Sequence, residues 1–430
     1  MQHLEFAPTP PLGWNSWDCY GATVREDEVR GNAEYMAEHL KAFGWEYVVV
    51  DIQWYEPGAV SDLYRPFVRL EMDRYSRLIP AANRFPSSEN GKGFKPLADY
   101  VHSLGLKFGI HIMRGIPRQA VHDNTPIKGT SVTARDIAHT CSFCGWNTDM
   151  YGVDASKEGA QEYYNSLFEL YAEWGVDYIK VDDIADSWLH GGAHLGEIEL
   201  IRKAIDHVGR PIVLSLSPGP APVKHADFLE NNANLWRMTD DFWDRWPLLL
   251  DMFDRCKTWE GRPKRGNWPD CDMLPLGRIG VRCSHPDRMT RFTRDEQLTM
   301  MTLWTIFRSP LMMGGEMRDN DEWTLSLLTN GDVLHMHRTS CGARQVSRIG
   351  DHVVWMAEGS SGERYVGLFN TGEEAADVSV SFSDMGIEGE SSVKNLWSGE
   401  SMGTMTASLS SVIAPHGAAL FRLDNVAKQA

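Results

Sequence analysis

Aspartates stand at the ends of several short apolar runs in this sequence. They are Asp51 in the second run, Asp182 and Asp183 in the fourth, Asp240 and Asp241 in the sixth, and Asp270 and Asp272 in the seventh. So many carboxylates on one face of a protein repel one another unless cations or a polyhydroxylated ligand compensate. Two chemistries use such a ring: divalent metal binding, and glycoside hydrolysis by paired carboxylates.

Two basic residues among these acids favour glycoside hydrolysis. Lys180 lies two residues before Asp182, and Arg237 lies four before Asp241. Side chains at i and i+2 of a strand share one face, and a neighbouring ammonium keeps a carboxylate ionised, as a nucleophile requires. Asp241 is then the second carboxylate, with a raised pKa that lets it protonate the leaving oxygen. A metal-dependent hydrolase is the alternative, which activity in excess chelator would exclude.

The runs that carry these residues alternate with amphipathic helical patterns over about three quarters of the chain, as is typical of parallel βα units. The predicted strands are Gly13–Trp17, Tyr47–Trp54, Lys107–Met113, Tyr178–Asp183, Ile212–Ser217, Leu235–Asp241, Asp270–Met273 and Ser309–Gly314. Eight is the strand number of a (β/α)₈ TIM barrel, an α/β fold whose active sites lie at the carboxyl ends of the strands. The acidic residues therefore belong at the mouth of a barrel.

After about Asn330 the pattern changes to short alternating runs separated by Gly, Asn, Asp and Ser. We predict a catalytic barrel over residues 1–330 and a small antiparallel β domain, with a packing role, over residues 331–430. The stretch Asn330–Gly342 is expected to be a linker, and Ser61–Pro96 a long loop near the barrel mouth. The predicted strands of the β domain are His352–Met356, Arg364–Phe369, Ala376–Phe382, Ser392–Leu396 and Ala418–Leu423.

The composition of the chain bears on its binding partners and on its cellular location. The 430 residues include 42 Lys and Arg against 59 Asp and Glu, a formal charge of −17, which argues against nucleic-acid binding. We see neither a membrane span nor a signal peptide, and seven scattered cysteines do not form a disulfide framework, so we expect a cytoplasmic protein. Cys141 and Cys144 have CxxC spacing, but two ordinary thiols are favoured over a zinc or redox site.

Several motifs, in order along the chain, resemble those of glycoside hydrolase family twenty-seven, the α-galactosidases and α-N-acetylgalactosaminidases. Pro10–Trp17 (PPLGWNSW) is similar to the PPxGWNSW start of that family, Tyr178–Asp182 (YIKVD) to its nucleophile strand, and Trp236–Asp241 (WRMTDD) to its acid/base strand. Further matches are Trp268–Leu274 (WPDCDML, like WNDPDML), Val50–Trp54, Leu104–Ile110 (LGLKFGI) and Leu303–Gly314. The likeness covers most of the barrel.

The resemblance implies a (β/α)₈ barrel followed by a β-sandwich, and a retaining mechanism through a covalent glycosyl-enzyme, which agrees with two carboxylates about 5 to 5.5 Å apart. It implies Asp182 as nucleophile and Asp241 as acid/base. It implies no metal and no organic cofactor, and a small carbohydrate as the partner. The implied substrate contacts are Trp14 as aromatic wall, Asp51 as hydroxyl acceptor, Lys180 and Arg237 as orienting cations, and Asp272 near the anomeric centre.

The position after Asp51 departs from the family pattern. The family usually has two adjacent aspartates there, one of which binds the galactose hydroxymethyl group, whereas this chain has Ile52. β-L-Arabinopyranose has the ring stereochemistry of α-D-galactopyranose but lacks that group, so Ile52 suits it better. Alternatively, Ile52 has only a packing role, and another residue contacts the hydroxymethyl group of a galactoside.

Two further positions depart from the pattern. Ser217 lies in a run of small residues, Ser215–Pro220, where the family has Cys-Glu-Trp; this run could admit an N-acetyl group, or another loop could fill the gap. His111 replaces a common tyrosine and is either a pocket donor or structural.

The leading hypothesis is a retaining exo-glycosidase for α-D-galactoside-shaped sugars, with a preference for β-L-arabinopyranosides. The alternatives are an α-N-acetylgalactosaminidase and a non-catalytic carbohydrate-binding protein on the same barrel, which the presence of both Asp182 and Asp241 disfavours. The family's disulfide beside the nucleophile is missing, since Asp183 and Ile184 follow Asp182. This agrees with a cytoplasmic enzyme acting on imported glycosides. A homo-oligomer remains open, and no nucleic-acid or membrane partner is expected.

Overall fold

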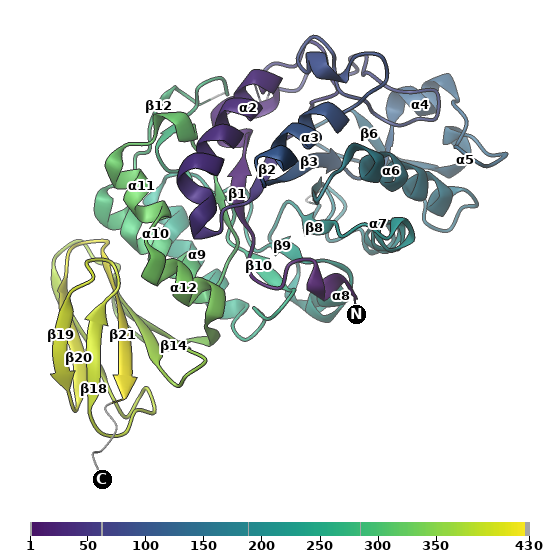
Figure 1. Ribbon diagram of the computed structural model, residues 1–430. Helices are drawn as coiled ribbons and strands as arrows, with labels where there is room; N and C mark the ends of the chain where they lie inside the picture. Colours follow the sequence, from purple (N-terminus) through teal and green to yellow (C-terminus); the bar gives the residue numbers. More distant parts are fainter. Residues whose placement is uncertain (1, 62, 188, 284, 426–430) are drawn as a thin grey trace.

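The computed structural model describes residues 2–61, 63–187, 189–283 and 285–425. Its N-terminal part is a barrel of eight parallel strands (Figure 1). The strands are β1 (Leu12–Asn15), β2 (Tyr47–Val50), β3 (Lys107–Met113), β7 (Tyr178–Asp182), β8 (Val213–Leu216), β9 (Leu235–Arg237), β10 (Trp268–Asp270) and β13 (Leu311–Met313). They pair in the order β10-β9-β8-β7-β3-β2-β1-β13, and a parallel bridge between Leu274 and Met313 joins the two ends. The predicted TIM barrel is confirmed, with a strand at each of the eight expected places; the seventh, predicted over Asp270–Met273, lies earlier, over Trp268–Asp270.

Helices surround the barrel (Figure 1). The α-helices are α1 (Trp17–Tyr20), α2 (Glu26–Tyr35), α3 (Lys95–Ser103), α4 (Arg118–Asp123), α5 (Ala134–Ile137), α6 (Ala160–Trp174), α7 (Leu195–Val208), α8 (Ala226–Asn232), α9 (Trp246–Thr258), α10 (Arg294–Phe307), α11 (Glu322–Leu328) and α12 (Gly331–Thr339). A π-helical turn, η3 (Met36–Leu40), and a 3₁₀ turn, η4 (Lys41–Phe43), continue α2. The other 3₁₀ turns are η1 (Gln2–Glu5), η2 (Gly21–Thr23), η5 (Pro86–Ser88), η6 (Val223–His225) and η7 (Met317–Asp319). Gly175, at φ 85°, ends α6 in the left-handed conformation that glycine adopts at low cost.

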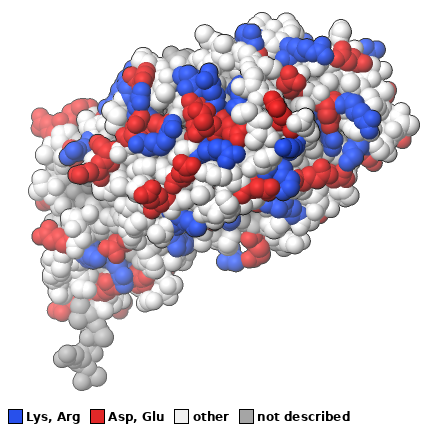
Figure 2. Space-filling view, turned by 45° about the horizontal axis from the view of Figure 1, so that its top comes forward, with Lys and Arg blue, Asp and Glu red and all other residues white. Residues whose placement is uncertain are grey.

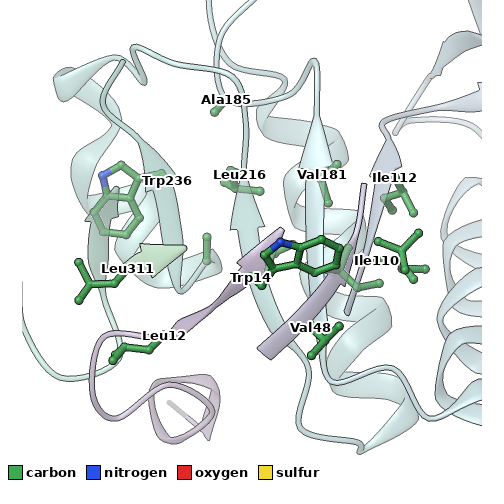
Figure 3. Packing of buried hydrophobic residues seen from close by; sticks show 14 of the residues in the cluster. Leu12, Trp14, Val48, Ile110, Ile112, Val181, Ala185, Leu216, Trp236 and Leu311 are labelled. Carbon is green, nitrogen blue, oxygen red and sulfur yellow. The ribbon is translucent and has the colours of Figure 1, made fainter. Parts of the chain in front are cut away.

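The alternation of side chains along each strand separates the packing face from the site. Leu12, Trp14, Val48, Val181 and Leu216 belong to the large buried cluster between strands and helices (Figure 3). The residues between them face the barrel interior, because successive side chains of a strand point to opposite sides. Tyr47, Val49, Tyr178, Val213, Leu235, Trp268 and Met312 form an apolar cluster at the floor of this interior. The polar residues of the site continue the same inward-facing rows toward the carboxyl ends.

Three segments leave the barrel pattern. A three-stranded sheet of β4 (Ile116–Pro117), β6 (Met150–Val153) and β5 (Ala138–Phe143) lies between β3 and α6, and sequence analysis did not predict it. A short hairpin of β11 (Arg278–Ile279) and β12 (Arg288–Met289) precedes α10. The described part of the loop predicted over Ser61–Pro96 has only the turn η5, one isolated bridge and the start of α3, so that expectation is confirmed.

The C-terminal part is antiparallel. One sheet has the order β14-β15-β16-β21-β18-β19, and β17 pairs with β20 in a second sheet. Their bounds are β14 (Cys341–Ile349), β15 (His352–Glu358), β16 (Arg364–Asn370), β17 (Ala376–Ser381), β18 (Ser391–Asn395), β19 (Ser401–Met405), β20 (Ser408–Ile413) and β21 (Ala418–Asn425). An apolar cluster that includes Val354, Val378, Leu409 and Phe421 holds the two sheets together. The predicted β-sandwich architecture is confirmed.

The expected linker Asn330–Gly342 is wrong, because helix α12 occupies most of it. The Asn330 carboxamide accepts a hydrogen bond of 3.1 Å from the Val333 amide and caps this helix, while Val333, Leu334 and Met336 are buried. The division of the chain at residue 330 stays a prediction.

On the face in Figure 2, basic and acidic side chains are interspersed rather than segregated. No helix in the described part of the chain is long and apolar enough to span a membrane.

Candidate active site

A pocket of about 270 Å³ opens at the carboxyl ends of the barrel strands. This volume lies below the usual range for drug-sized ligands, about 300 to 1,000 Å³, and so suits a small molecule. The pocket brings together five of the residues that sequence analysis predicted. Its lining consists of Trp17, Asp51, Ile52, Tyr64, Trp146, Lys180, Asp182, Pro218, Asp240 and Asp241.

Asp182 ends strand β7 with both carboxylate oxygens bound. The backbone amide of Asp183 donates to Oδ1 at 2.8 Å, and Nε2 of His111 lies 3.0 Å from Oδ2. Burial raises the pKa of Asp182, but the His111 hydrogen bond, with help from the Lys180 charge, outweighs it and holds the pKa below its ordinary value. Asp182 is therefore a fixed, ionised carboxylate, and His111 is a fully buried partner behind it rather than part of the pocket lining.

Lys180 and Asp51 form a second pair on the pocket wall. Lys180 Nζ donates to Asp51 Oδ2 at 3.0 Å, and Asn15 Nδ2 donates to the same oxygen at 2.8 Å. The Ile52 amide donates to Asp51 Oδ1 at 2.8 Å. Burial alone would raise the Asp51 pKa, yet the Lys180 ammonium brings it well below its ordinary value, and Asp51 in turn raises that of Lys180. The pair thus offers a charged donor and a charged acceptor side by side.

Arg237 at the end of β9 bridges two acids. Its guanidinium lies 3.0 Å from Asp241 Oδ1 and 3.0 Å from Asp272 Oδ1. The arginine and Asp272 are buried, whereas the side chain of Asp241 is 56% exposed. Ser217 Oγ is 3.5 Å from the same guanidinium and is also buried. Ser217, Arg237 and Asp272 therefore line the smaller space beneath the pocket rather than the pocket itself.

Asp241 lies at the open rim of the pocket. Its side chain is 56% exposed, and its carboxylate accepts a hydrogen bond of 3.0 Å from Arg237. The proton-donor role expected for Asp241 stays a prediction.

Asp270 and Asp272 are two further buried acids of the site. Burial raises the pKa of Asp270 to about 7, with a further contribution from the charge of Asp272. Burial also raises the pKa of Asp272, which Arg237 opposes. The backbone amide of Asp272 donates a hydrogen bond of 2.8 Å to Asp270 Oδ1, so Asp270 helps to fix the backbone at Asp272.

Trp14 is not the aromatic wall of the pocket, and this expectation is wrong. Trp14 lies on the outward-facing row of β1, is fully buried, and donates its indole N–H to the Gly315 carbonyl at 2.9 Å (Figure 3). Trp17 lines the pocket instead and stacks on Tyr64 with ring centroids 6.4 Å apart. Trp146 lies 5.3 Å from Tyr64, centroid to centroid.

Trp17, Tyr64 and Trp146 are the lining residues that sequence analysis missed. Tyr64 and Trp146 come from the Ser61–Pro96 loop and from the segment between β5 and β6, which no strand-end rule finds. Trp17 ends the first predicted strand, but only the polar residues at strand ends were considered as site candidates. For Tyr64 the signal was an aromatic residue in a loop expected near the barrel mouth.

Two family models match this chain. Residues 9–157 and 151–339 match the model for alpha galactosidase A, and residues 349–423 match the model for the alpha galactosidase C-terminal beta sandwich domain. The chain belongs to the α-galactosidase family of glycoside hydrolases.

Three relatives place it within that family. A crystal structure of a family twenty-seven β-L-arabinopyranosidase from Geobacillus stearothermophilus is 65% identical, with a TM-score of 0.99 over 100% of this chain and 99% of that one. A putative α-N-acetylgalactosaminidase from Bacillus halodurans is 57% identical, with a TM-score of 0.89 over 97% and 98% of the two chains. Alpha-galactosidase 2 of Arabidopsis thaliana is 26% identical over 97% of this chain and 90% of its own length.

The buried acid Asp270 makes a testable contribution to the pH dependence of stability. Its folded-state pKa of about 7 lies above the ordinary value of 3.8, so the folded protein binds more protons than the unfolded chain between these values. The contribution of Asp270 is therefore fully present below about pH 4 and is lost as the pH rises through 7. We expect Asp270→Asn to become progressively more stable than the wild type over that interval, measured by urea unfolding. A constant difference between the two curves would contradict the raised pKa.

Proposed function

We propose that this glycoside hydrolase removes terminal β-L-arabinopyranosyl groups with retention of configuration, with Asp182 as nucleophile and Asp241 as acid/base. The observation that carries the substrate preference is Ile52 in the pocket lining, directly beside the Lys180–Asp51 pair. The 65% identical relative supports it, since that protein is a β-L-arabinopyranosidase and a second structure of it holds arabinose.

The proposed first step is attack by an Asp182 oxygen on the anomeric carbon. The new bond forms as the bond to the leaving oxygen breaks, and Asp241 gives its proton to that oxygen. A sugar in the pocket would cover the exposed Asp241 carboxyl, and burial favours the neutral form of a carboxylic acid. In the second step Asp241 removes a proton from water, which attacks the anomeric carbon and releases Asp182.

Fixed hydrogen bonds prepare Asp182 for this step. The Asp183 amide and His111 leave the carboxylate little freedom to rotate, and the pKa below its ordinary value keeps it ionised. A nucleophile held in an attacking position needs little reorganisation when the bond forms.

Recognition of the sugar rests on polar and apolar parts of the same wall. Lys180 and Asp51 would donate to and accept from ring hydroxyls, while Trp17, Tyr64 and Trp146 offer aromatic surface near the rim. Ile52 offers only carbon atoms at the position where the family places a second aspartate. A galactoside would therefore bury a hydroxymethyl oxygen without a partner, which costs about 1 to 3 kcal/mol.

The nucleophile assignment predicts the outcome of Asp182→Ala. Turnover of p-nitrophenyl β-L-arabinopyranoside should fall by at least about a thousandfold, because the covalent route is lost. Added azide should restore part of it and give a glycosyl azide of inverted configuration, which NMR would identify. Wild-type turnover by this variant would refute the assignment.

Asp241→Ala provides the matched comparison. Turnover by this variant should fall severely for substrates with poor leaving groups and only slightly for aryl glycosides with good ones, because only poor leaving groups need a proton. Equal losses across a leaving-group series would argue against Asp241 as the acid.

The specificity assignment predicts the effect of Ile52→Asp. A carboxylate at position 52 would accept a hydrogen bond from the hydroxymethyl group, so the galactoside-to-arabinoside ratio of kcat/KM should rise roughly 5- to 150-fold, the equivalent of about 1 to 3 kcal/mol. Ile52→Val is the control and should leave the ratio within about twofold, because it changes volume but not polarity. An unchanged ratio in Ile52→Asp would place the specificity elsewhere.

A further inference from the structure

The residue that follows the proposed nucleophile has an unusual backbone. Asp183 has φ 55°, in the left-handed region that non-glycine residues rarely adopt, and it is only 3% exposed. This conformation accompanies the 2.8 Å hydrogen bond from the Asp183 amide to Asp182 Oδ1. A residue kept in such a conformation needs surrounding contacts that enforce it.

Arg114 supplies those contacts from the loop after β3. Its Nε donates to the Asp183 carbonyl at 2.6 Å, and its Nη2 lies 2.9 Å from Asp183 Oδ2. Its own backbone amide donates to the Asp182 carbonyl at 3.1 Å. One buried guanidinium therefore holds residue 183 at both its backbone and its side chain, on the side away from the pocket.

The surrounding helices hold Arg114 in turn. Its Nη1 donates to Glu197 Oε1 at 3.0 Å, in the first turn of α7, and the hydroxyl of Tyr164 on α6 donates to Glu197 Oε2 at 2.6 Å. Glu197 is 5% exposed, and Tyr164 is 1% exposed. Burial raises the pKa of Asp183 to about 7, and the Arg114 charge opposes that rise. The network thus runs from two helices to the amide that faces the nucleophile.

We propose that Arg114 is a positioning residue that acts through Asp183: it fixes residue 183 so that its amide keeps the Asp182 carboxylate on the line of attack. This rests on the proposed role of Asp182 as nucleophile. The guanidinium itself does not line the pocket, so its effect must pass through Asp182.

Arg114→Lys tests this, because a lysine cannot reproduce the planar fork that holds two groups of one residue. We expect kcat for p-nitrophenyl β-L-arabinopyranoside to fall about 10- to 100-fold, as for a nucleophile displaced by about 1 Å, with the inhibition constant of L-arabinose within about threefold of the wild type. Arg308→Lys is the matched control. Arg308 is also buried and donates hydrogen bonds to the carbonyls of His337 and Arg338, but it lies outside the site. The Arg308→Lys substitution should therefore reduce the stability of the fold and leave kcat within about twofold of the wild type.

The decisive readout is made in the Asp182→Ala background. Azide replaces the carboxylate there, so Arg114 has no nucleophile to position, and the azide-rescued rates with and without Arg114→Lys should be equal. If the loss from Arg114→Lys persists in full with azide, Arg114 supports the pocket as a whole and the proposal is wrong. An unchanged kcat in Arg114→Lys alone would also overturn it. Failure of the nucleophile assignment looks different, since Asp182→Ala would then retain turnover or gain nothing from azide.

Two substitutions at residue 183 test the proposal even if Arg114→Lys does not fold. Asparagine tolerates the left-handed conformation and keeps an oxygen for Arg114, so Asp183→Asn should retain kcat within about threefold. Asp183→Gly removes the side-chain contact and frees the backbone, so its kcat should fall about 10- to 100-fold. The opposite order, or equal values for the two variants, would contradict a positioning role.

Discussion

Compensation of buried negative charge is the constraint on which the site depends. Asp51, Asp182, Asp270 and Asp272 converge inside one barrel, and the cations between them are Arg237, which is buried, and Lys180, whose side chain is 13% exposed. The Lys180 charge lowers the pKa values of Asp51 and Asp182, while Asp270, farther from a direct cation contact, has its pKa raised by burial. One barrel therefore holds both carboxylates with lowered pKa values and carboxyls with raised ones, and the balance between burial on one side and hydrogen bonds and nearby charges on the other sets the direction at each residue.

Strand geometry made much of this predictable. A parallel barrel brings the carboxyl ends of distant strands to one face, so Asp51, Lys180, Asp182 and Asp241 could be placed together from their positions in the sequence alone. The same geometry explains the failure at Trp14. It stands one residue away from the inward-facing Asn15 on β1, and a shift of one residue moves a side chain to the opposite face.

Other features could not be predicted because they depend on packing between segments far apart in the sequence. The aromatic residues of the pocket come from three separate segments. The Ser61–Pro96 loop brings Tyr64 against Trp17, and the segment between β5 and β6 brings Trp146 against Tyr64. Strands β14, β19 and β20 have many exposed residues and a weak alternation of apolar side chains, so their sequences carry little strand signal. Helix α12 was missed because the Asn330 cap and three buried apolar residues were interpreted as part of a turn-rich boundary.

The proposed specificity depends on the apolar wall at Ile52 beside the Lys180–Asp51 pair. Its most direct test is kcat/KM of the pure wild-type protein on p-nitrophenyl β-L-arabinopyranoside, α-D-galactopyranoside and α-N-acetylgalactosaminide, measured side by side. The account predicts that the arabinopyranoside is preferred over the galactoside roughly 5- to 150-fold, as expected for one hydroxyl buried without a partner. An equal or higher value for either of the other two substrates would contradict it.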